Sequence, residues 1–132
     1  MTDVALREET NLVHALLAAR KQTKSYLEIS TYRYGSLWVY GQAFEPGTRL
    51  CCVNSDSGWE SWCENELECT AGRLWDRGYP TQIFYADSQE ESTSDAVWNL
   101  WARDQDIDVI LVDTDHGFDG TVRNLELYVP ML

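Results

Sequence analysis

Three aspartates follow an apolar run in the stretch ILVDTDHGFDG, residues 110–120. Asp113 and Asp115 stand at alternate positions, and carboxylate oxygens placed in this way can bind Mg²⁺. If the strands predicted over 81–86 and 107–112 are parallel neighbours, the aspartates that follow them meet at the carboxyl edge of the sheet, where open α/β sheets bind ligands. One hypothesis is therefore a Mg²⁺-dependent hydrolase or nuclease-like domain. Its metal ligands would be Asp87, Asp113 and Asp115.

The same stretch also suits an acidic turn between two strands, because Asp and Gly favour the backbone conformations of turns. Chemistry on phosphates normally uses Lys or Arg side chains, and residues 50–132 contain only four arginines. The sequence offers no evident base or nucleophile beside the aspartates. We therefore favour the turn, and we expect no catalytic residues, no bound metal and no cofactor, in a protein that is not an enzyme.

The negative charge is concentrated in the later part of the chain. The net charge is −12 over 132 residues. Residues 1–49 hold six basic and five acidic side chains, whereas residues 50–132 hold four basic and seventeen acidic ones. Such a field repels nucleic acid and anionic membranes and attracts basic protein surfaces.

This charge predicts a small acidic binding or inhibitor protein that occupies the basic, nucleic-acid-binding site of a partner protein. In physical type it resembles phage counter-defence (anti-CRISPR) proteins, DNA mimics and immunity proteins that block nuclease toxins, in which carboxylates take the place of phosphates. Exposed tryptophans would anchor the contact. The residues expected to bind the partner are Trp59, Glu60, Trp62, Glu64, Glu68, Glu90, Glu91, Asp113, Asp115 and Asp119.

A third hypothesis is a homo-oligomeric structural protein. The aromatic residues between 32 and 40 would then form a face that binds a second copy, as in a homodimer. We expect a cytoplasmic protein, because no apolar run approaches the roughly 20 residues of a membrane span and the N-terminus does not resemble a signal peptide. The four cysteines have no zinc-site spacing and are expected to be reduced.

The apolar periodicity predicts one compact domain over residues 1–132. Its fold class is α+β, with a mixed, mostly antiparallel sheet, helices packed on it and one βαβ unit in the C-terminal half. Alternating residues around Gly35-Ser36 predict a β-hairpin, and Gly78 is expected to end a helix. The expected order is α-β-β-β-α-β-α-β-β: helix 3–22, the hairpin, a strand from residue 49, helix 59–77, strand 81–86, helix 94–104, strand 107–112 and a final strand over 121–129.

Overall fold

The computed structural model describes residues 22–30, 34–54, 61–103, 105–113 and 117–132. The helix expected over 3–22 therefore lies almost wholly outside the described residues. The described elements are β1 Ser25–Ser30, α2 Tyr34–Gly41, β2 Arg49–Asn54, α3 Ser61–Asp76, β3 Thr81–Tyr85, α4 Glu91–Ala96, the π-helix η1 Val97–Ala102, β4 Val109–Asp113, α5 Phe118–Tyr128 and the 3-10 helix η2 Val129–Met131.

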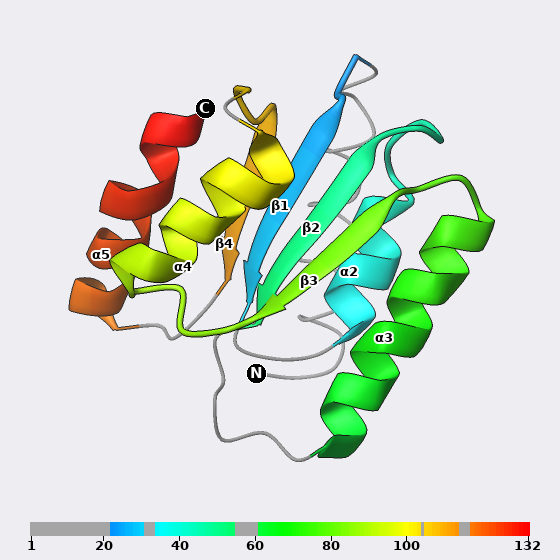
Figure 1. The fold of residues 1–132 in the computed structure, drawn as a ribbon, viewed down its shortest axis with the longest axis horizontal. Helices are drawn as coiled ribbons and strands as arrows, with labels where there is room; N and C mark the ends of the chain where they lie inside the picture. Colours follow the sequence, from blue (N-terminus) through cyan, green and yellow to red (C-terminus); the bar gives the residue numbers. More distant parts are fainter. Residues whose placement is uncertain (1–21, 31–33, 55–60, 104, 114–116) are drawn as a thin grey trace, which may run out of the picture.

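The four strands form one all-parallel sheet in the order β3-β2-β1-β4. Helices α2 and α3 lie on one face of the sheet, and α4, η1 and α5 lie on the other side (Figure 1). The expected α+β class with a mostly antiparallel sheet is therefore wrong, and the fold is a Rossmann-like α/β layer structure.

The first strand of the expected β-hairpin forms as β1, but its second half, around Gly35-Ser36, is α2, a helix between two parallel strands. Parallel neighbours need a crossover connection, which a hairpin cannot provide. The buried residues Leu37, Tyr40 and Phe44 are three and four positions apart, so they lie on one side of a helical path. The aromatic content of the segment favoured a strand on propensity, and packing overrides that preference.

The expected final strand over 121–129 is also a helix, α5. Its buried residues Gly120, Asn124 and Tyr128 are spaced four apart and face the sheet together. The polar and apolar residues of this segment alternate as well, so its sequence fits both periodicities. The βαβ unit is parallel as expected, but its strands are not adjacent, because β2 and β1 lie between β3 and β4.

Three further predicted strands and a helix end are confirmed. β2, β3 and β4 form where the apolar runs predict them, and α3 covers most of the predicted helix 59–77. Gly78 follows α3 with φ +94°, and its N–H donates to the carbonyl of Trp75 at 3.0 Å. This is the left-handed helix end that glycine favours.

Both faces of the sheet are buried against helices. One cluster joins Leu27 and Ile29 to η1 and to Tyr128 of α5, and the other joins Tyr26 to Leu37 and Leu74 of α2 and α3. Among the described residues, no helix is long and apolar enough to cross a membrane.

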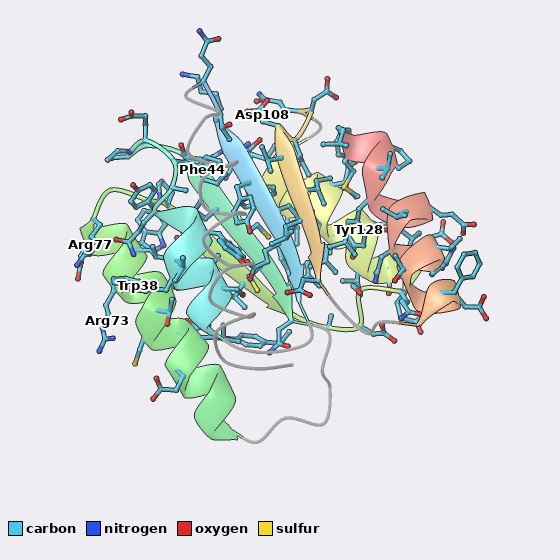
Figure 2. All side chains as sticks on the ribbon, turned by 180° about the vertical axis from the view of Figure 1, so that it is seen from behind. Trp38, Phe44, Arg73, Arg77, Asp108 and Tyr128 are labelled. Carbon is cyan, nitrogen blue, oxygen red and sulfur yellow. The ribbon has the colours of Figure 1, made fainter. Side chains whose placement is uncertain are left out.

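Asp108 fixes the amino ends of two neighbouring strands. Its carboxylate accepts hydrogen bonds from the backbone N–H groups of Lys24 and Ser25, at 2.6 and 3.2 Å, and its own N–H donates to Ser25 Oγ at 3.1 Å. Figure 2 shows Asp108 at the start of β4. The strands β1 and β4 therefore begin at the same level of the sheet.

The Tyr128 hydroxyl allows a test of the packing between α5 and the sheet, where this side chain lies (Figure 2). The side chain is fully buried, its hydroxyl has no hydrogen-bond partner among the described residues, and burial raises its pKa. We expect Tyr128→Phe to raise the free energy of unfolding by about 1 kcal/mol, because an unsatisfied hydroxyl is removed from the interior. Urea denaturation measures the change.

The matched control is Tyr26→Phe, since Tyr26 is equally buried but its hydroxyl donates to Glu28 at 2.9 Å. This variant should lose about 1–3 kcal/mol. Equal destabilisation by the two substitutions would contradict the assignment of an unsatisfied hydroxyl at Tyr128.

Candidate functional site

The carboxyl ends of the four strands form one row of residues. The register pairs Tyr85 with Asn54, Asn54 with Ser30, and Ser30 with Asp113. Three of these four residue types are polar or charged, whereas the strand interiors are largely apolar. The polar groups of the sheet are therefore gathered where the strands end.

The chain changes direction across the sheet between β1 and β4. From β1 it proceeds to β2 and β3 on one side, and from β3 it crosses back to β4 on the other side of β1. The helices also change face at this point. The chain continues from β1 into α2 on one face of the sheet, and from β4 into α5 on the other face (Figure 1). Open α/β sheets bind their ligands in the crevice at such a switch point.

Glu28 of β1 lies two residues inside this edge, between Cys52 and Leu111 of the neighbouring strands. Its side chain is 1% exposed. The hydroxyls of Tyr26 and Ser36 donate to its two carboxylate oxygens, both at 2.9 Å, and the Cys52 sulfur is 4.0 Å away. The Ser36 contact ties α2 to the sheet.

Burial raises the pKa of Glu28 to about 7, although the two hydroxyl donors favour the ionised form. The negative charge of Asp113 at the edge raises this pKa further. Glu28 is therefore a carboxyl group that changes charge near neutral pH, and it is electrostatically coupled to the switch point.

The segment after β3 forms hydrogen bonds with α5, on the face of the sheet that α4 and α5 cover. Ser88 Oγ donates to the side-chain oxygen of Asn124 at 2.7 Å, and both residues are fully buried. Arg123 Nε donates to the carbonyl of Gln89 at 3.1 Å. Asp87 accepts a hydrogen bond from the Gln89 N–H at 2.9 Å, which makes a local turn. These contacts position the start of α4 beside α5.

The metal hypothesis assumed neighbouring strands, and that assumption is wrong. Asp87 follows β3 and Asp113 ends β4, which are the two edge strands of the sheet. Their ends are three strand spacings apart, about 14 Å. Among the described residues, no group of three His, Cys, Asp or Glu side chains could hold a metal ion. Asp115 lies outside those residues.

Four of the expected partner-binding residues lie at the carboxyl edge of the sheet. Glu90 and Glu91 precede and begin α4, Asp113 ends β4, and Asp119 lies in the first turn of α5. Acidic residues at helix starts are favoured by the helix dipole, which gives most of this charge a local structural reason. Glu68 lies on α3 and accepts a hydrogen bond from the Tyr85 hydroxyl at 2.7 Å.

The remaining members of that set are not tested. Trp59, Glu60 and Asp115 lie outside the described residues, as do the side chains of Trp62 and Glu64. Whether the chain binds a basic protein surface or forms a homodimer stays a prediction.

Glu28 and Asn54 are site residues that were not predicted from the sequence. Alternation along this strand places Glu28 on the face opposite to Leu27 and Ile29, and the parallel sheet, which is covered on both sides, buries both faces. The sequence did indicate this residue, because Glu28 is a single acidic residue in the middle of a largely apolar strand. Asn54 could have been found as the polar residue that ends the apolar run of β2.

No known protein family and no curated protein matches the sequence. Solved structures do match its fold. One is the O-methyltransferase TomG from Streptomyces achromogenes, involved in tomaymycin synthesis and solved with SAM, at 18% identity and a TM-score of 0.59. Another is an O-methyltransferase from Bacillus cereus solved with SAH, at 14% identity and a TM-score of 0.62.

Both matches cover 91% of this chain, and they cover 50% and 51% of the two methyltransferases. The chain thus has the Rossmann-like fold of these enzymes and spans about half of their length. This finding overturns the expectation of an acidic inhibitor, with its hydrolase and structural alternatives, and also the expectation that the protein is not an enzyme.

The buried carboxyl group gives a pH test of the site. The pKa of Glu28 is about 7 in the folded chain against 4.5 for an ordinary glutamate, so the folded state holds a proton that the unfolded state has lost. Between pH 4.5 and 7 this group should lower the free energy of unfolding by about 3 kcal/mol as the pH rises.

We expect Glu28→Gln to remove this dependence, because the amide does not titrate. Urea denaturation of both proteins between pH 4 and 8 measures the difference. Parallel pH profiles of the wild type and the variant would show that folding does not raise the pKa of Glu28.

Proposed function

We propose that this chain is an S-adenosylmethionine-binding, methyltransferase-like domain that binds its cofactor at the switch point between β1 and β4. The observation that supports this most is the parallel sheet of order β3-β2-β1-β4, with Asp113 and the buried Glu28 beside its switch point. The fold likeness to two O-methyltransferases solved with SAM and SAH supports the same class.

The charges at this edge fit the cofactor. S-adenosylmethionine has a sulfonium and an ammonium group against one carboxylate, so it carries a net positive charge. Asp113 is exposed at the end of β4, and the net charge of the chain is −12. A field of this sign attracts a cationic cofactor and repels nucleotides with several phosphates.

The sequence after β1 argues against a dinucleotide as the ligand. Dinucleotide-binding sheets carry the fingerprint G-x-G-x-x-G after the first strand, where glycines allow the backbone to approach the pyrophosphate. Here the sequence after β1 reads TYRYGS, with Gly35 as its one glycine. S-adenosylmethionine contains no pyrophosphate, so it does not require that fingerprint.

Each described residue at the edge has a proposed role. Asp113 would lie near the cationic part of the cofactor, and Asn54, at the end of β2, stands where Rossmann-like folds bind the ribose hydroxyls. Glu28 is a positioning residue, because it is buried and acts through Ser36 and through the charge of Asp113. The cofactor supplies an activated methyl group when bound.

The proposal extends to methyl transfer as the reaction type. A nucleophilic oxygen of the acceptor would attack the methyl carbon while the carbon–sulfur bond breaks, so that S-adenosylhomocysteine leaves and the acceptor loses its proton to water or a base. The contribution of this chain would be to hold the cofactor in one orientation at the sheet edge.

The test is calorimetric titration of the chain with S-adenosylmethionine and S-adenosylhomocysteine. We expect both to bind at one site, and Asp113→Asn to weaken S-adenosylmethionine about five- to tenfold, because a carboxylate near a cation contributes on the order of 1 kcal/mol at an exposed site. S-adenosylhomocysteine should weaken less, since its thioether carries no charge.

The matched control is Asp106→Asn, which removes the same charge from an exposed aspartate before β4, at the opposite end of the strand. Its affinity for both ligands should equal that of the wild type. Absence of binding at millimolar S-adenosylmethionine would refute the proposed function, and equal losses in the two variants would refute the role of Asp113.

A further inference from the structure

A cavity of about 470 Å³ lies at the amino edge of the sheet, at the opposite end of the strands from the switch point. It lies between the end of η1 and the starts of β2 and β3, with the end of α3 at its rim. Cavities of this size hold small organic ligands in many proteins. The lining includes Arg49, Trp75, Gln82, Leu100, Trp101 and Arg103.

The charge of this cavity is opposite to that of the chain. Two of the six basic residues in the described part of the sequence line it, and none of its described lining residues is acidic. The chain as a whole has a net charge of −12. A basic cavity in an acidic protein is unexpected from composition alone, and it selects an anionic ligand.

The guanidinium of Arg49 is held in place before any ligand binds. Its Nη1 donates to the carbonyl of Trp101 at 2.7 Å, and its central carbon lies 5.1 Å from the centre of the Trp101 ring. This arrangement combines a hydrogen bond with a cation–π contact. A guanidinium fixed in this way loses little conformational freedom when it binds a carboxylate.

Arg103 stands where the backbone favours glycine. It follows η1 with φ 55° and ψ 47°, and its backbone N–H donates to the carbonyl of Trp98. Glycine or asparagine is the usual residue at such a left-handed helix end, so the backbone alone gives no reason for an arginine. Within the described parts of the chain, its side chain has no hydrogen bond or ion pair, which leaves its charge available to the cavity.

Two large apolar side chains of the cavity are exposed. Trp75 is 57% exposed and Leu100 is 62% exposed. The indole N–H of Trp75 donates to the carbonyl of Thr81 at 2.9 Å, which fixes the ring at the rim. The lining thus offers a flat apolar surface beside two cations, a combination that fits a ligand with an aromatic part and an acidic group.

We propose that this cavity binds an aromatic carboxylate, with the carboxylate group on Arg49 and Arg103 and the ring on Trp75 and Leu100. The site is separate from the cofactor edge, because β2 from Arg49 to Asn54 spans about 17 Å. The proposal therefore goes beyond the proposed methyltransferase function and does not rest on it.

The test uses 2-naphthoate and its neutral analogue 2-naphthamide, titrated calorimetrically into the full chain. We expect 2-naphthoate to bind at one site, about tenfold tighter than 2-naphthamide, because charge-assisted hydrogen bonds to two guanidinium groups are lost with the amide. Arg103→Asn should weaken 2-naphthoate about fivefold or more while leaving 2-naphthamide unchanged. Asparagine tolerates the left-handed conformation, so this variant should fold normally.

The matched control is Arg73→Asn. Arg73 is an exposed arginine that points from α3 away from the sheet (Figure 2) and does not line the cavity. Its substitution should not change the affinity for 2-naphthoate. Equal affinity for the two naphthalenes, equal loss in the two arginine variants, or no binding at millimolar 2-naphthoate would each overturn the proposal. A loss of 2-naphthoate binding in Asp113→Asn would also overturn it, because the two sites would then not be separate.

Discussion

The burial of β1 is the constraint on which the rest of the structure depends. This strand has a parallel partner on each side and a helical layer on each face, and its side chains from Ser25 to Ile29 are at most 2% exposed. Its register fixes the ends of β2 and β4 relative to Ser30. The row that contains Asn54 and Asp113, and with it the switch point, follows from the pairing of this one strand.

A carboxyl group in such a strand is costly unless it is hydrogen-bonded or protonated, and Glu28 combines both solutions. One hydroxyl donor comes from β1 itself and the other from α2, so the polar group also joins the first crossover helix to the sheet. The charge of Asp113 opposes ionisation of Glu28. A cation bound beside Asp113 would offset that effect, so cofactor binding and the charge of Glu28 are expected to be linked.

Local features of the sequence predicted the strands and helix ends that local interactions determine. The apolar runs of β2 and β4 and the helix end at Gly78 were found because each depends on neighbouring residues. The aromatic segment of α2 and the doubly periodic segment of α5 were assigned to strands, since only packing against the sheet decides between the two patterns. The strand order also depends on contacts between distant parts of the chain. The position of β1 and β2 between β3 and β4 could therefore not be predicted from local patterns.

The parallel sheet places charged residues at both of its edges. All strands end, and the helices that follow them begin, at one end of the molecule, where Glu91 and Asp119 lie in the first turns of α4 and α5. The helices end at the opposite edge, where Arg77 and Arg103 follow α3 and η1. The net charge of −12 is therefore a poor guide to any one surface. Asp113 lies at the carboxyl edge of the sheet, and Arg49 and Arg103 lie at the amino edge, so side chains of opposite sign favour a cationic ligand at the first edge and an anionic ligand at the second.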